Sequence, residues 1–212
     1  MGYRQTWIDH HAGWEVRVWT DDTIPENARR PEVYEPLRGP AERSDILRFE
    51  LLWRFGGVYV DCDFECLRSI EPMLDGVEFF AAYRKTGRAN NTIIGSVASH
   101  PLTDRALDEI RPRATYGPVD KEGTGPLFFD RLLAEFPGVT LFEPGVFYPR
   151  THRARDRAHA VHHRARAWKD ADGLRSSVRK AQRRLQNATE DARQWRLKAE
   201  QAEAELQRLT RT

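Results

Sequence analysis

The sequence predicts a single α/β domain with a mostly parallel central sheet, followed by a long C-terminal helix. Between Glu15 and Trp168, short segments rich in β-branched and aromatic residues alternate with stretches whose apolar residues recur every three or four positions. At 212 residues the chain is long enough for one domain with a sizeable core plus an appendage. We therefore expect one domain over residues 1–173 and a separate helix over residues 174–212.

Composition and charge narrow the class of protein. The chain is 40% hydrophobic and 31% charged, which is typical of globular proteins, and no run approaches the roughly 18 apolar residues of a membrane-spanning helix. The net charge is +2, and the ten Lys or Arg and five Asp or Glu from Leu174 onward leave −3 for the rest of the chain. This is not the broad basic surface of a nucleic-acid binder, so we expect no nucleic-acid partner. The scarcity of cysteine, only Cys62 and Cys66, indicates a cytoplasmic protein, either free or peripheral to a membrane.

The first elements in the chain are a polar helical segment, an alternating strand over Glu15 to Trp19 and a turn at Thr20 to Asp22. Residues 29–40 are rich in proline and charge and suit a loop.

A buried helix, a glycine turn and a strand are predicted in succession within residues 41–65. Gly56 and Gly57 end the helix, because glycine readily adopts the left-handed conformation found after a helix C-terminus. Asp45 and Arg48 lie on the single polar stripe of an otherwise apolar helix, and burying such groups needs a reason. The apolar positions of the helix are Ile46, Leu47, Phe49, Leu51, Leu52, Trp53 and Phe55.

Two carboxylates follow the strand directly, in the order Asp61-Cys62-Asp63. In an extended segment residues i and i+2 point the same way, so Asp61 and Asp63 would present their oxygens on one side. Such a pair suits Mg²⁺ or Mn²⁺, whose remaining ligands are often waters and substrate phosphates. The alternative is a solvated loop, but the position at the end of an apolar strand favours a metal-diphosphate site.

The motifs S-D-I-L-R and G-G-V-Y-V-D-C-D resemble those of sugar transferases with a DXD motif, including initiating mannosyltransferases, glycolipid α-galactosyltransferases and capsular polysaccharide enzymes. The resemblance covers roughly Trp7 to Trp168. It implies a Rossmann-like nucleotide-diphospho-sugar transferase domain of the GT-A type. It also implies that Asp45 and Arg48 touch the donor sugar, while Asp61 and Asp63 hold the metal-diphosphate.

Four further residues match the resembled family more weakly. Asn91 is implied as a sugar contact, with an Asx turn as the alternative. Thr124 and Gly125 precede a helix and are implied to contact the donor, because a helix N-terminus suits anions and sugar oxygens, with an ordinary helix-entry turn as the alternative. A late histidine is implied to complete the metal shell, and His162 matches best, with His163 as the alternative.

The remaining elements follow in order along the chain. The sequence predicts a turn with a short helical piece at 66–74, strands at 77–84 and 92–97, a helix from Pro101, a helix from Pro126, strands at 139–142 and 146–148, and an alanine-rich strand within 159–168. Compared with the resembled family, no candidate for the first strand precedes Tyr3. We therefore expect the domain to lack that strand.

The segment from Leu174 carries a heptad pattern sustained for five repeats. This predicts a helix that either forms a homodimer as a weak coiled coil or stands alone as a charged helix. The apolar positions are Leu174, Val178, Ala181, Leu185, Ala188, Ala192, Trp195, Ala199, Ala202, Leu206 and Leu209.

The function expected from these residues is that of a metal-dependent, retaining glycosyltransferase. Its donor would be a UDP- or GDP-sugar, and its acceptor a hydroxyl on a glycan, lipid or protein. Retention of configuration is implied by the resemblance alone. Two alternatives remain open: a degraded transferase domain that serves as a scaffold, and a phosphatase of the haloacid dehalogenase type, which also places D-x-D after a strand.

Overall fold

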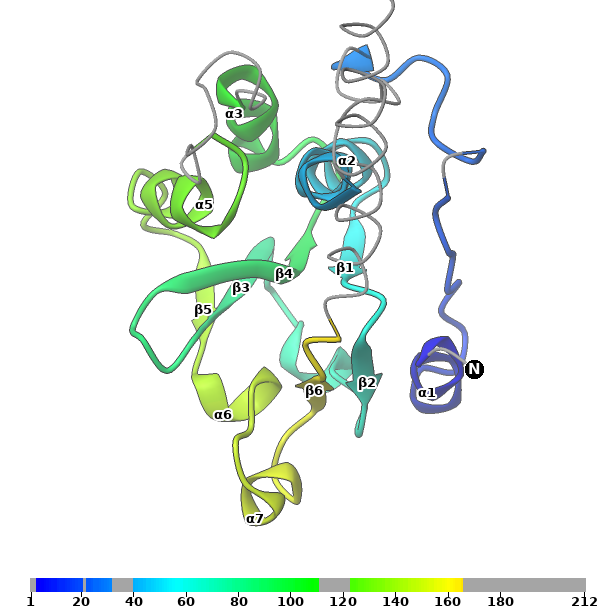
Figure 1. Cartoon of the computed structure of the whole chain (residues 1–212), viewed down its shortest axis with the longest axis vertical. Helices are drawn as coiled ribbons and strands as arrows, with labels where there is room; N and C mark the ends of the chain where they lie inside the picture. Colours follow the sequence, from blue (N-terminus) through cyan, green and yellow to red (C-terminus); the bar gives the residue numbers. More distant parts are fainter. Residues whose placement is uncertain (1–2, 21, 32–39, 111–122, 166–212) are drawn as a thin grey trace, which may run out of the picture. The chain divides into compact units, whose positions relative to one another are not determined.

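A computed structural model describes residues 3–20, 22–31, 40–110 and 123–165. The chain divides into two compact units, residues 1–165 and 166–212, and the described residues belong to the first (Figure 1). The helix expected over residues 174–212, its heptad pattern and the domain boundary at residue 173 lie outside the described residues.

The described elements are helical and extended segments in irregular alternation. In chain order they are α1 (Arg4–His10), α2 (Pro40–Phe55), β1 (Gly57–Val60), β2 (Phe64–Cys66), the 3-10 turn η2 (Glu71–Met73), β3 (Phe79–Tyr83), β4 (Ala89–Ser96), α3 (Pro101–Glu109), α5 (Pro126–Leu133), β5 (Thr140–Phe142), α6 (Pro144–Phe147), α7 (His152–Arg155) and β6 (Ala160–His162). The α/β class predicted from the sequence is confirmed.

The main sheet has four strands in the order β1-β4-β3-β5, and a second ribbon pairs β2 with β6. Strand β4 runs antiparallel to β1 and to β3, and only the β3–β5 pair is parallel among the described strands. The expectation of a mostly parallel sheet is therefore wrong for the described residues. Parallel neighbours need a long crossover connection, usually a helix, but the chain between β1 and β4 contains only the short turn η2. The tight turn from β3 to β4 likewise joins two antiparallel strands.

Strand β3 is buried on both faces because the core lies on both sides of the sheet. Phe79 and Ala81 pack with α2, α3 and α5, whereas Phe80 and Ala82 pack with residues of β2, α6 and β6. Figure 1 shows α2, α3 and α5 together on one side of the sheet, with α6 and the β2–β6 ribbon on the other. The sheet is thus the middle layer that connects α2 to the β2–β6 ribbon.

Helix α2 ends where the two glycines predict. Gly56 and Gly57 have φ values of +65° and +92°. A Cβ on Gly56 would lie 2.7 Å from the backbone nitrogen of Ala98, so this position has no room for a side chain. The close approach joins the end of α2 to the segment that follows β4, and it fixes where β1 begins.

Two predicted strands are not observed. The segment Glu15–Trp19 has no regular structure and pairs with no strand in the described part of the chain, where β4 is the one partner of β1. The segment Val146–Tyr148 is largely helical, because Pro144 begins the short helix α6. Strand β4 also starts earlier than expected and includes Asn91.

Among the described residues, no helix is both long and apolar enough to cross a membrane.

Candidate metal and donor site

The two carboxylates of the D-x-D motif lie in a turn rather than in a strand. Strand β1 ends at Val60, and the backbone N–H of Phe64 donates to the carbonyl of Asp61 at 3.0 Å. The N–H of Asp61 in turn donates to the carbonyl of Thr92 in β4 at 2.9 Å. The extended backbone expected at this point is therefore replaced by a turn anchored to β4, and the turn brings the side chains of Asp61 and Asp63 together.

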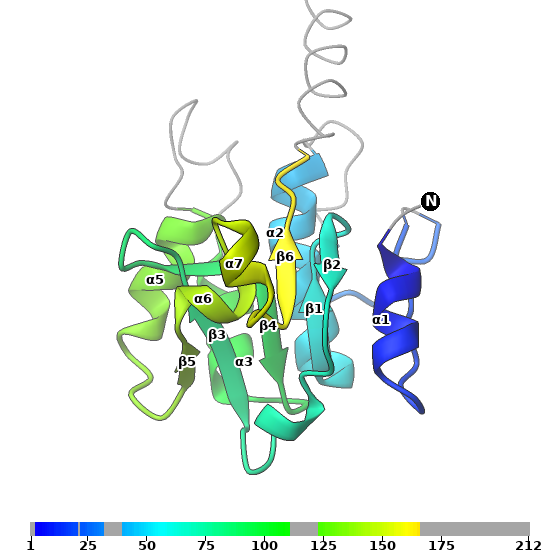
Figure 2. The ribbon, with the colours of Figure 1, turned by 90° about the horizontal axis from the view of Figure 1, so that it is seen from below.

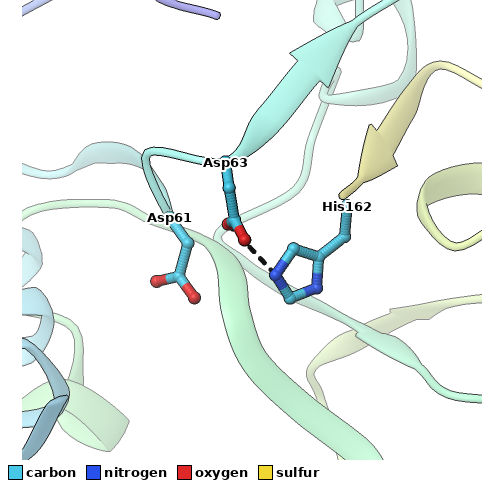
Figure 3. Close-up of side chains that lie close together, drawn as sticks. All are labelled: Asp61, Asp63 and His162. Atoms are coloured by element: carbon cyan, nitrogen blue, oxygen red, sulfur yellow. Dashed lines mark ion pairs between the residues drawn. The ribbon is translucent and has the colours of Figure 1, made fainter. Parts of the chain in front are cut away.

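A cluster of three metal-ligand side chains forms at this turn. Asp61, Asp63 and His162 each offer one ligand atom, and these atoms all lie within 4.8 Å of one another. Figure 3 shows the three side chains converging, with His162 reaching across from the end of β6. The pairing of Phe64 with His162 in the β2–β6 ribbon places the imidazole there, and its Nε2 lies 3.1 Å from Oδ1 of Asp63. The cluster therefore joins residues about 100 positions apart in the sequence.

The neighbouring histidine points elsewhere. His163 Nε2 lies 2.9 Å from a carboxylate oxygen of Glu65, and its ring stacks on Tyr3 at 4.4 Å between ring centroids. Glu65 also accepts a hydrogen bond from Arg155 at 2.7 Å. Of the two histidines, it is His162 that the structure places with Asp61 and Asp63.

The donor set fits a divalent ion such as Mn²⁺ or Mg²⁺. Two carboxylates and one imidazole suit these ions, and bonds of about 2.1 Å span ligand atoms up to about 4.2 Å apart, so a small side-chain shift closes the cluster around one ion. Burial lowers the pKa of His162 and outweighs the opposite influence of Asp63 and Asp61. The imidazole is therefore neutral near pH 7, as a metal ligand must be.

A buried guanidinium connects helix α2 to the D-x-D turn. Arg48 is 2% exposed and lies 2.9 Å from Asp45 and 3.6 Å from Asp61. Its guanidinium carbon lies 4.8 Å from the centre of the Tyr59 ring, and it donates to the backbone carbonyl of Asn91. The Nδ2 of Asn91 donates to Asp45 at 2.9 Å. The polar stripe predicted on α2 thus lies against β1 and β4, beside the metal cluster.

Asp45 and Asn91 form the partly exposed end of this network. The Asp45 side chain is 18% exposed, and burial raises its pKa to about 6, against the opposing influence of Arg48. Asn91 lies inside β4 and is 1% exposed, so the Asx-turn alternative does not describe it. Arg48 is enclosed, so Asp45 has the more accessible oxygens for a ligand.

Thr124 and Gly125 lie at the start of helix α5. Thr124 is 8% exposed and Gly125 caps the N-terminus of α5. Within the described part of the chain, neither makes a hydrogen bond to Asp45 or to the metal cluster. Helix α5 reaches β4 instead through Asp130, which accepts from the N–H of Ala89 at 2.8 Å.

Sequence reasoning missed three groups that hold the cluster in place. The Tyr59 hydroxyl donates to Asp61 at 3.1 Å, and the N–H of Ala165 donates to the second oxygen of Asp63 at 2.8 Å. Tyr148, whose pKa burial raises to about 12, bonds to Thr92 at 2.9 Å beside the turn. Tyr59 could have been found because it precedes Asp61 by two positions on an apolar strand, whereas Ala165 and Tyr148 carried no sequence signal.

Comparison with known proteins finds a family model that matches the region carrying these motifs. Residues 1–80 match the model described as "Glycosyltransferase sugar-binding region containing DXD motif". This match confirms the predicted resemblance to DXD-motif glycosyltransferases. The matched region contains α2, the glycine turn and the D-x-D motif, and it ends within β3.

Two similar fungal proteins act on lipids according to their names. A mannosyl phosphorylinositol ceramide synthase of Saccharomyces cerevisiae is 31% identical over 63% of this chain and 37% of its own length. An inositol phosphoceramide mannosyltransferase of Schizosaccharomyces pombe is 27% identical over 60% of this chain and 38% of its own length.

Among solved structures, the PaToxG glycosyltransferase aligns at 26% identity with a TM-score of 0.38, over 46% of this chain and 37% of its own length. The match thus spans less than two fifths of each of these proteins.

Proposed function

We propose that this chain carries the donor- and metal-binding region of a GT-A-type glycosyltransferase, which transfers a sugar from a nucleotide-diphospho-sugar to a hydroxyl acceptor with retention of configuration. The observation that supports this most is the convergence of Asp61, Asp63 and His162 at the D-x-D turn, whose two aspartates lie in the region matched by the family model. The chemistry of those ligands suits the diphosphate of such a donor.

The reaction breaks the bond between the anomeric carbon of the sugar and the diphosphate oxygen. It forms a bond from that carbon to the acceptor oxygen, and the acceptor proton leaves with the diphosphate or to solvent. A divalent ion held by Asp61, Asp63 and His162 would neutralise charge that builds on the leaving phosphate. Asp45 would accept hydrogen bonds from sugar hydroxyls and so orient the donor, while Asn91 holds the Asp45 carboxylate in place.

Arg48 and Tyr59 hold this arrangement rather than bind the substrate. The guanidinium lies between Asp45 and Asp61, and the Tyr59 hydroxyl fixes the Asp61 carboxylate. Burial raises the pKa of Tyr59, so the phenol remains protonated and continues to donate. Both side chains therefore preorganise the carboxylates before the donor arrives.

The names of the fungal relatives support a mannosyl donor and a lipid acceptor. The family match also disfavours the phosphatase alternative, because the D-x-D motif lies within the region that matches the glycosyltransferase model. The scaffold alternative is distinguished by measurement, since a scaffold needs neither metal nor nucleotide.

The test is isothermal calorimetry of UDP and GDP binding in the presence of Mn²⁺. We expect binding of one nucleotide that falls about 100-fold in Asp61→Asn and in Asp63→Asn, because each removes a charged metal ligand. Asp75→Asn is the matched control, because this exposed carboxylate lies outside the cluster. Undiminished binding in the presence of a chelator, or equal affinity in all variants, would contradict the proposal.

A further inference from the structure

The charges of the proposed site cancel before a donor arrives. The carboxylates of Asp61 and Asp63 balance a divalent cation, and Asp45 balances Arg48, with which it is in contact. The diphosphate of a nucleotide-sugar brings two negative charges, and a third develops as the sugar bond breaks. A low-dielectric site needs further positive charge to stabilise that leaving group.

Arg48 does not supply this charge. Its Nε donates to the carbonyl of Ser44 at 3.0 Å, one terminal nitrogen donates to the carbonyl of Asn91, and the other faces Asp45. Because each of its three nitrogens faces a partner within the protein and its side chain is 2–3% exposed, this guanidinium is poorly accessible to a phosphate oxygen.

Arg84 is a first candidate for the missing charge. It follows β3 at the start of the β3–β4 turn, where its N–H donates to the carbonyl of Arg88 at 2.8 Å. Its side chain is partly exposed, and within the described residues its guanidinium forms no ion pair. Strands β1 and β3 both run antiparallel to β4, so Arg84, which follows β3, lies at the same end of the sheet as Asp61, which follows β1.

Arg164 is the second candidate, two residues after His162. It adopts a left-handed backbone conformation, with φ of 55°, which is uncommon for a residue other than glycine. The turn around it wraps Asp63, because the N–H groups of His163 and Ala165 donate to the Asp63 backbone carbonyl and carboxylate at 3.0 and 2.8 Å. In the described structure its guanidinium is exposed and forms no ion pair. Burial lowers the pKa of His162, and the charges of Arg164 and Arg84 lower it further.

We propose that Arg84 and Arg164 form a pair of phosphate-binding guanidinium groups, which flank the metal cluster from β3 and β6 and contact the diphosphate of the donor. This inference rests on the proposed function. Each guanidinium can donate two parallel hydrogen bonds to phosphate oxygens, and together they balance the two negative charges of the bound diphosphate. Both would bind the leaving diphosphate more tightly than the intact donor, because its charge is greater.

The experiment compares nucleoside diphosphate with nucleoside monophosphate on the 212-residue chain. Calorimetry with saturating Mn²⁺ gives the ratio of the GDP and GMP affinities, or of UDP and UMP, for each variant. We expect Arg84→Gln and Arg164→Asn each to lower this ratio about tenfold, as expected for loss of a hydrogen bond to a charged group. Asparagine is chosen at position 164 because it tolerates the left-handed conformation. Arg84→Lys keeps the charge and should recover part of the loss.

Two controls separate a direct contact from a structural effect. Arg153→Gln removes an exposed arginine of α7 that forms no ion pair in the described part of the chain, and its ratio should equal that of the parent. Mn²⁺ affinity without nucleotide should not fall in the Arg84 and Arg164 variants, because these residues are not ligands.

The outcomes are distinct. If the parent discriminates for diphosphate and both variants keep its ratio, the inference alone is wrong. A fall in metal affinity without nucleotide, equal in size to the fall in GDP affinity, would also overturn it, since the arginines would then act on the cluster itself. If the parent binds no nucleotide with Mn²⁺, the proposed function fails and this inference fails with it.

Discussion

At the scale of single residues, the site depends on charges that are buried in contact with opposite charges. Arg48 is enclosed between Asp45 and Asp61, and removing one member of such a group typically costs about 3–5 kcal/mol because the remaining charge is left without a partner. The same enclosure fixes the direction of the Asp61 carboxylate. The residue therefore fixes the geometry of a proposed metal ligand.

The protonation of His162 gives a prediction about metal binding. Its pKa lies below the ordinary value of 6.5 because the ring is buried, so the neutral ligand form persists as pH falls toward 6.5 and is lost only below that value. We expect Mn²⁺ affinity to be nearly constant from pH 8 to about pH 6.5 and to fall in more acidic solution, where protons compete for Nε2.

Metal titrations across this pH range test the assignment of the ligand. His162→Gln should weaken binding about tenfold or more at pH 7 and flatten the decline, whereas His163→Gln should leave both unchanged, because that ring faces Glu65. The reverse pattern would assign the ligand to His163.

Sequence reasoning reached the residues whose signal is local. Asp61, Asp63, Asp45 and Arg48 stood out because charges followed or interrupted apolar patterns. The hydrogen bonds of Arg48 to Ser44 and Asn91 were not predictable, because both partners offer backbone carbonyls that any residue type would provide.

At the scale of elements, helix α1 covers the open edge of β2 with side chains in place of a strand. Thr6 accepts from the N–H of Cys66 at 2.9 Å, the Trp7 indole donates to the carbonyl of Phe64 at 3.0 Å, and His11 accepts from the N–H of Ile70 at 2.9 Å. Figure 2 shows α1 alongside the β2–β6 ribbon. Because Phe64 follows Asp63 directly, this contact also supports the metal cluster.

Replacing Trp7 by phenylalanine tests this support. The change leaves a buried carbonyl without its donor, which costs about 1–3 kcal/mol, or roughly 2–4 °C in melting temperature per kcal/mol for a chain of this size. We expect that loss together with a severalfold weaker Mn²⁺ affinity.

Trp14→Phe is the control for the Trp7 variant, because the Trp14 indole has no hydrogen bond among the described residues. Its melting temperature and metal affinity should stay closer to those of the parent. Equal effects in the two variants would show that ring size matters rather than the bond to β2.

Elements whose signal is local were predictable, whereas elements that depend on a partner were not. Helix α2 was predictable from the spacing of its apolar residues. Its C-terminal end was predictable from Gly56 and Gly57, which adopt positive φ angles. The segment Glu15–Trp19 alternates as a strand should, yet it does not pair in the described structure, because alternation does not supply a neighbour.

At the scale of the whole molecule, strand direction is set by connections rather than by composition. Strands β3 and β4 are largely buried on both faces, as the strands of a parallel sheet are, but a short turn between them forces antiparallel pairing. The α/β class was therefore predictable and the strand directions were not.

The segment from Leu174 gives the last prediction, at the scale of assembly. Its heptad seam predicts a homodimer, and its alanine-rich middle buries little area, so the association should be weak. In analytical ultracentrifugation at micromolar concentration, we expect the full chain to show a concentration-dependent rise in mass that is absent when residues 174–212 are deleted. Donor hydrolysis should remain nearly intact, because the proposed site residues lie within residues 45–164. Leu185→Glu, on the seam, should abolish this rise in mass, whereas Gln186→Glu, beside the seam, should not. If the two variants behave alike, or if the full chain stays monomeric, the heptad pattern marks only a solvated helix.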